Sequence, residues 1–176
     1  MMLLGVPPLA ATPSAVPPQS APLPMAPVES IFHIEKSENR NQVHYAVHVD
    51  ASCKPLGPRP IYGYWRDLER GPTAVSPLLD HEQRAYGLNE PRSIRIADAA
   101  SEIAITLRAF PERQLIVQVF RWGDRCFART VTRVKNQPAL LQSIYIDIGF
   151  LFSVNYAIVR GVRVQGGTPI QEKVHD

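Results

Sequence analysis

The sequence has few of the residues and motifs that identify a particular chemistry. It contains two cysteines, Cys53 and Cys126, and neither belongs to a closely spaced pair of the kind that binds zinc. It contains no Gly-x-Ser-x-Gly, no phosphate-binding glycine loop and no His-Glu-x-x-His motif. Nucleophilic hydrolysis, nucleotide binding and zincin-type proteolysis therefore have no support, and we expect no cofactor.

Residues 1–28 lack any charged side chain and hold eight of the 17 prolines. Met1–Ala15 is similar to the end of a secretion signal, with a short apolar stretch and then small residues, but it lacks the basic residues that open such a signal. Pro7–Pro27 is rich in Pro, Ala and Ser and cannot bury a core. We expect a signal-like remnant and disordered linker over 1–28 in an exported protein, periplasmic or secreted. The alternative is a disordered tail.

The rest of the chain has the composition of one soluble domain, which we place at 29–166, followed by a flexible tail over 167–176. No run reaches the 18 apolar residues of a membrane-spanning helix. The net charge of +3 is too small to indicate a nucleic-acid partner. The segment between Arg92 and Lys135, however, contains nine basic and four acidic residues. That local excess indicates either a solvated sheet face or an anion-binding surface.

From Ser30 onward apolar residues alternate with a period of two, which predicts strands. The strands are short and separated by turns rich in Gly, Pro, Asn and Asp. The pattern predicts an all-β fold, an antiparallel meander forming a single barrel or sandwich of about eight or nine strands, with at most one or two short helical turns. Asn136–Gln142 is expected to be a loop with one such turn.

Three hairpins allow the strand register to be predicted. In Phe32–Asp50, a turn centred on Asn39–Arg40 would place Ile34 opposite Tyr45 and Phe32 opposite Val47. A turn at Pro111–Arg113 would place Ile105 opposite Val119. The Gly123–Asp124 pair suits a two-residue turn and would place Phe120 opposite Phe127.

Several segments together resemble a bacterial family catalogued as domain of unknown function 4833. The residues that carry the resemblance are Phe32-His33-Ile34 with Ser37, Asn39, Asn41, Val43 and Tyr45, then Pro60-Ile61-Tyr62-Gly63-Tyr64-Trp65, and Glu82 with Ala85-Tyr86-Gly87. The resemblance covers most of 31–164 and includes His33 but not His44 or His48. The family implies domain limits and no particular reaction.

The first hairpin also gathers a candidate metal site, His33, Glu35, His44 and His48, which share one face in the predicted register. Imidazoles with a carboxylate suit zinc or copper. His44 and His48, however, lie four residues apart, about 13 Å along a strand, which is too far for one ion without help from His33 or another strand. The alternative interpretation is a solvated polar face of the hairpin.

A second candidate site is aromatic. Tyr62, Tyr64, Trp65 and Arg66 lie in one strand, and Glu82 and Tyr86 follow in the next segment. Aromatic residues with a charged pair can line a ligand pocket. They can equally pack a core, with Glu82 bound to Arg66 or to backbone amides.

Two hypotheses of function follow. The domain is a non-catalytic binding or interaction module at the cell envelope, with a small or anionic ligand or an envelope protein as its partner. The alternative is a metal-binding protein or metal-dependent enzyme that uses the hairpin histidines. In an oxidising compartment Cys53 and Cys126 can form a disulfide, and in the cytosol they would be two small apolar residues.

Overall fold

The computed structural model describes residues 30–97, 100–150 and 154–175. These residues form eleven strands and one helix, α1 (Asp80–Tyr86). The strands are β1 (Phe32–Lys36), β2 (Gln42–Val47), β3 (Ile61–Arg66), β4 (Val75–Pro77), β5 (Ser93–Ile96), β6 (Ala100–Leu107), β7 (Phe110–Trp122), β8 (Arg125–Val134), β9 (Gln137–Ile148), β10 (Val154–Arg163) and β11 (Pro169–Val174). The all-β prediction is confirmed. No helix in the described part of the chain is long and apolar enough to cross a membrane.

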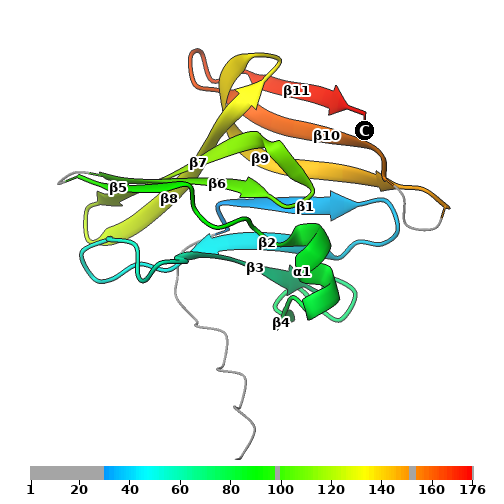
Figure 1. Ribbon diagram of the computed structural model, residues 1–176, viewed down its shortest axis with the longest axis horizontal. Coiled ribbons are helices and arrows are strands. Elements are labelled where there is room, and N and C mark those ends of the chain that lie inside the picture. Colours follow the sequence, from blue (N-terminus) through cyan, green and yellow to red (C-terminus); the bar gives the residue numbers. More distant parts are fainter. Residues whose placement is uncertain (1–29, 98–99, 151–153, 176) are drawn as a thin grey trace, which may run out of the picture.

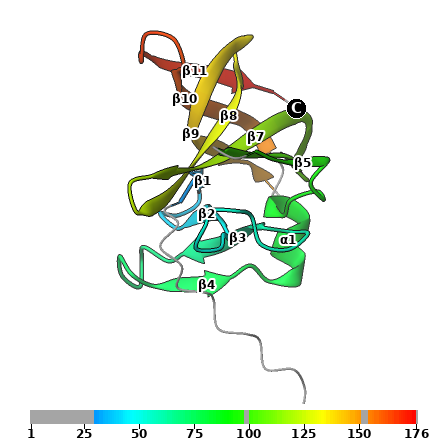
Figure 2. The ribbon, with the colours of Figure 1, turned by 90° about the vertical axis from the view of Figure 1, so that its left-hand side faces the viewer.

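All eleven strands belong to one open sheet, and β9 is its branch point. β10 pairs along β9 from Ala139 to Ile148. β8 and β1 therefore share the other edge of β9, with β8 at Gln137–Leu140 and β1 at Ser143–Ile146. From this branch two arms diverge, β1-β2-β3-β4 and β8-β7-β6-β5, while β10 and β11 continue beyond β9 (Figures 1 and 2). The β1–β9 pair is parallel, so the sheet is not the purely antiparallel meander that was expected.

The inward faces of the two arms form one hydrophobic core. Strand alternation directs every second side chain into it, which is the period of two seen in the sequence. Phe32 and Tyr45 stack with ring centroids 4.4 Å apart, and both are buried. The facing arm contributes the fully buried side chains Ile103, Ile105, Leu115, Val117 and Val119. Burial of each large apolar side chain stabilises the fold by roughly 1.5–3 kcal/mol before the entropy of ordering is counted.

Two contacts join the loop after β2 to the β7–β8 hairpin of the other arm, and a third joins β2 to α1. Cys53, in the loop after β2, forms a disulfide with Cys126 at the start of β8. The Arg121 guanidinium donates a hydrogen bond to the Ala51 carbonyl in the same loop. The buried Tyr45 hydroxyl donates to the carbonyl of Tyr86, at the end of α1, across 2.6 Å.

The predicted registers have mixed outcomes. The β7–β8 pairing is confirmed, with Phe120 opposite Phe127 across the two-residue Gly123–Asp124 turn. The β1–β2 register was wrong by two residues, since Phe32 pairs with Tyr45 and Ile34 with Val43. A shift of two keeps every side chain on the same face, so alternation cannot distinguish the two pairings.

The β6–β7 register was also wrong. Ile105 lies opposite Leu115 rather than Val119, because the chain turns at Arg108–Ala109 and β7 already begins at Phe110. Pro111 is thus part of a strand and not of the turn. A register shift between Thr106 and Leu107 accommodates the tight return.

Two further expectations about the second half of the chain were wrong. Asn136–Gln142 is not a loop with a helical turn, because β8 and β9 join directly at Lys135 and Asn136. Both residues have positive φ, 49° and 60°, as a two-residue turn of mirror-image type requires. The tail expected from residue 167 contains β11, which pairs with β10 over six residues.

Candidate functional site

The outer face of β1, β2 and β3 brings residues of the two predicted sites together. Phe32 and Ile34 point into the core, so His33 and Glu35 alternate to the outside. The register places His33 opposite His44, and His44 opposite Tyr64. The imidazole rings of His33 and His44 stack at 5.1 Å, and the Tyr64 ring lies 5.8 Å beyond. We call this row of rings the His–Tyr row.

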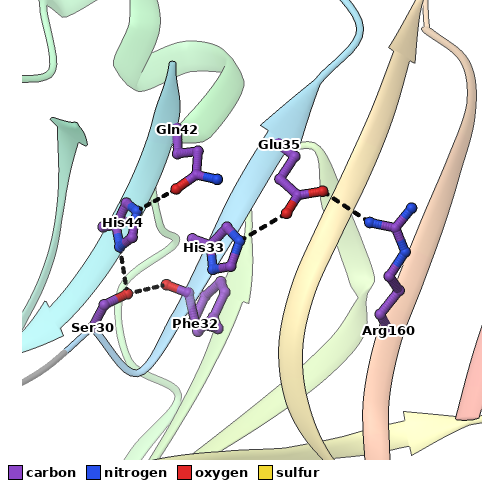
Figure 3. Close-up of polar contacts among 7 residues, drawn as sticks. All are labelled: Ser30, Phe32, His33, Glu35, Gln42, His44 and Arg160. Atoms are coloured by element: carbon purple, nitrogen blue, oxygen red, sulfur yellow. Dashed lines mark hydrogen bonds and ion pairs between the residues drawn. The ribbon is translucent and has the colours of Figure 1, made fainter. Parts of the chain in front are cut away.

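His44 is the most buried member of the row, with 5% of the residue exposed. Its Nδ1 lies 2.7 Å from the Ser30 hydroxyl and its Nε2 2.8 Å from the Gln42 side-chain oxygen (Figure 3). The pKa of His44 is lowered to about 4, chiefly by burial and further by the nearby His33 and Arg66. At neutral pH the ring is therefore uncharged, with one nitrogen donating and the other accepting.

His33 belongs to a second polar network that reaches across the sheet. Its Nε2 lies 3.0 Å from a carboxylate oxygen of Glu35, and the other oxygen of Glu35 accepts from Arg160 of β10 at 2.8 Å (Figure 3). The Arg160 guanidinium also lies 5.5 Å from the centre of the Tyr145 ring. These partly exposed groups satisfy one another, so the network fixes side chains on the outer face and holds no isolated charge.

The predicted metal site is not assembled. His48 lies away from the other two histidines and contacts Tyr62, with ring centroids 5.0 Å apart. Both ring nitrogens of His44 already have hydrogen-bond partners, and His33 has Glu35. Over residues 30–97, 100–150 and 154–175, no three His, Cys, Asp or Glu residues are grouped so that they could hold a metal ion.

The six predicted ligand residues fall on two sides of the sheet. Tyr62, Tyr64 and Arg66 lie on the outer face, where burial raises the pKa of both tyrosines. Trp65 lies on the core side, where its ring contacts the Tyr86 ring edge-on with the ring centroids 5.5 Å apart. The Lys36 ammonium lies over the Trp65 ring, 4.7 Å from the ring centroid. These six residues therefore do not form one pocket.

The charged residues of that set have local structural roles. The Glu82 carboxylate accepts the backbone N–H of Leu79 at 2.7 Å and so caps the start of α1. The Arg66 guanidinium donates to the carbonyl of Pro72 at 3.1 Å. Tyr62 borders a hollow of about 420 Å³ whose lining also includes Arg59 and Arg108.

A larger hollow lies elsewhere among the described residues. An open cleft of about 840 Å³ separates the start of β7 and the end of β8 from β10 and β11. Its apolar lining comprises Ile116, Val131, Ile146, Val154, Ala157 and Val174, among others. Arg113, Arg133, Glu172 and His175 also border it. Sites that bind small molecules have this composition, mostly apolar with a few polar groups.

The polar groups of the cleft are partly fixed. Arg113 forms an ion pair with Glu172 at 2.9 Å and donates to the backbone carbonyl of Arg133. The pair connects β7 to β11, so it keeps the two walls in place while leaving the apolar surface between them open. Sequence reasoning missed this cleft because Arg113 was assigned to a turn and Glu172 to a tail.

Comparison with known families gives a match over most of the chain. The family model described as Domain of unknown function (DUF4833) matches residues 32–173, most of the chain. The chain belongs to the DUF4833 family. The match ends within β11, so in this DUF4833 domain the His–Tyr row lies inside the matched region, and so does the cleft except for Val174 and His175. No curated protein and no solved structure matches the chain.

Proposed function

We propose that this DUF4833 domain is a non-catalytic binding module that holds a small amphiphilic molecule in the cleft between β7–β8 and β10–β11. The observation that carries the proposal is the cleft itself. Its volume of about 840 Å³ lies within the range of sites that bury most of a small ligand.

The lining defines the chemical class of the ligand. Ile116, Val131 and Val174 offer apolar surface, which favours an aliphatic or aromatic body because its burial removes apolar area from water. Arg133 lies at the border, while the neighbouring Arg113 is already neutralised by Glu172. The expected ligand therefore also has a carboxylate or other anionic head group, which would lie beside the Arg133 guanidinium.

A binding titration tests this proposal. We expect a fluorescent fatty-acid analogue to bind the wild-type domain, and Val154→Trp and Val131→Phe to weaken binding at least tenfold by filling the cleft. Val75→Trp is the matched control, since Val75 is exposed on β4 and does not line the cleft. Absence of binding, or equal binding by all three variants, would refute the proposal.

Export to the periplasm or the cell exterior is part of the same proposal. The Cys53–Cys126 disulfide supports it, because structural disulfides persist in oxidising compartments and are rare in the cytosol. Fractionation of cells that make the protein from its native gene, followed by thiol labelling before and after reduction, provides the test. We expect the protein outside the cytosol with both thiols blocked; a cytosolic protein with two free thiols would contradict export.

A further inference from the structure

One end of the molecule carries large apolar side chains in the open. Trp122 is 75% exposed and sits beside the two-residue Gly123–Asp124 turn, directly opposite Arg125. Next to it on the outer face, Phe120 and Phe127 stack at 6.2 Å, and the Arg129 guanidinium lies 5.4 Å from the Phe120 ring. A single exposed apolar residue needs no explanation, but a cluster of them does.

Two neighbouring segments carry further exposed apolar side chains at the same end, with Ile96 on the opposite face of the sheet from Phe120 and Trp122. Ile96, at the end of β5, is 57% exposed, and Leu56, in the loop after β2, is 49% exposed. The pairing of Ile96 with Ser101, and of Ser101 with Val119, places the end of β5 beside the end of β7. In Figure 1 the loop after β2, the end of β5 and the tip of the β7–β8 hairpin lie together at the left of the molecule.

This end is also rich in cations. Exposed basic side chains surround the apolar ones: Lys54, Arg95, Arg121, Arg125 and Arg129. Among the described residues of this end three are acidic, and two of them already have partners. The Asp50 carboxylate accepts the N–H groups of Ser52 and Lys54, and Glu102 accepts from the Gln118 amide. Asp124 is the third.

We infer that this end, the Trp122 end, docks the protein on an anionic phospholipid membrane. Tryptophan side chains with flanking Arg or Lys residues are favoured at the membrane–water interface, where the rings enter the headgroup layer and the cations meet lipid phosphates. The Arg residues here stand next to aromatic and aliphatic side chains, a combination that a membrane accommodates better than a purely polar partner does.

Covalent and hydrogen-bond contacts hold the segments of the Trp122 end in place relative to one another. The Cys53–Cys126 disulfide and the hydrogen bond from Arg121 to Ala51 tie the loop after β2 to the hairpin. The hairpin tip therefore does not have to be ordered when it binds, which reduces the entropic cost of docking. The cleft lies towards the other end of β7, about 20 Å along the strand from Trp122 to Ile116, so docking leaves it open.

Vesicle binding tests the inference. We expect the domain to sediment with vesicles of three parts phosphatidylcholine to one part phosphatidylglycerol, and much less with pure phosphatidylcholine. Binding should fall as salt increases and should shift tryptophan fluorescence to the blue. Trp122→Ala and Arg125→Glu should each weaken binding at least tenfold, with unchanged circular dichroism.

Matched variants and competing partners decide the outcome. Val75→Ala and Arg163→Glu change exposed residues outside the Trp122 end and should bind as the wild type does. The inference is overturned if no vesicle is bound, if the two vesicle types bind equally, or if the Trp122 and Arg125 variants bind normally. Tighter binding to duplex DNA than to anionic vesicles, or dimerisation abolished by Trp122→Ala, would instead assign this end to nucleic acid or to a second copy.

Discussion

Cys53 and Cys126 form a disulfide that joins positions 73 residues apart in the chain and links the two arms of the sheet. One cysteine lies in the loop after β2 and the other at the start of β8. The bond thus closes a long loop at the point where the arms face each other, and it constrains the unfolded chain strongly.

Removal of this bond should destabilise the domain substantially. For the Cys53→Ser/Cys126→Ser double variant we expect the free energy of unfolding to fall by roughly 2–4 kcal/mol. Urea denaturation monitored by circular dichroism measures the change. Wild-type protein unfolded in the presence of reductant should lose a similar amount, whereas equal stability of oxidised and reduced protein would show that the bond does not hold the arms together.

The hydrogen bond between Tyr45 and Tyr86 supplies a second test of the arrangement of arm and helix. Tyr45→Phe keeps the ring stacked on Phe32 but leaves the Tyr86 carbonyl without its donor. We expect a loss of about 1–2 kcal/mol in the free energy of unfolding. Tyr156→Phe, in a partly exposed ring on β10, is the control and should change stability by less than about 0.5 kcal/mol. Identical effects of the two substitutions would contradict the assigned bond.

Burial of His44 predicts a pH dependence of stability. Its pKa is about 4 in the folded protein and 6.5 in the ordinary case, so the unfolded chain binds the proton more tightly. The contribution of His44 to the free energy of unfolding is therefore complete above pH 6.5. It declines by roughly 1–3 kcal/mol as the pH falls from about 6.5 to about 4.

The His44→Gln variant should show a flatter stability profile across that pH interval than the wild type. Urea denaturation at closely spaced pH values measures both profiles. His81→Gln, on the exposed side of α1, is the matched control and should retain the wild-type slope. If His44→Gln and the wild type lose stability in parallel, His44 does not have the lowered pKa.

The sequence predicted faces more reliably than registers. Alternation correctly placed Phe32, Ile34 and Tyr45 inside, and the Gly123–Asp124 turn correctly paired Phe120 with Phe127. A register error of an even number of residues leaves the faces intact, so only the turn can correct it. The first turn depends on short-range polar contacts, such as the bond from the Asn41 N–H to the Asn39 side chain, whose closure the pattern does not reveal.

Long-range pairings explain what the sequence could not predict of the candidate sites. Glu35 meets Arg160 across 125 residues of sequence, and this contact depends on the parallel pairing of β1 with β9. The cleft depends in the same way on Arg113 meeting Glu172. No local pattern in the chain encodes either contact. The separation of Trp65 from Tyr64, by contrast, follows from alternation alone.

The central claim is that the cleft between β7–β8 and β10–β11 binds an amphiphilic molecule. The most direct test is to map the contacts by nuclear magnetic resonance during a titration of the wild-type domain with dodecanoate. The account predicts saturable shift changes concentrated at Ile116, Val131, Ala157 and Val174, with the His–Tyr row at His33 and Tyr64 unaffected. Changes confined to the His–Tyr row, or no saturable change at all, would contradict it.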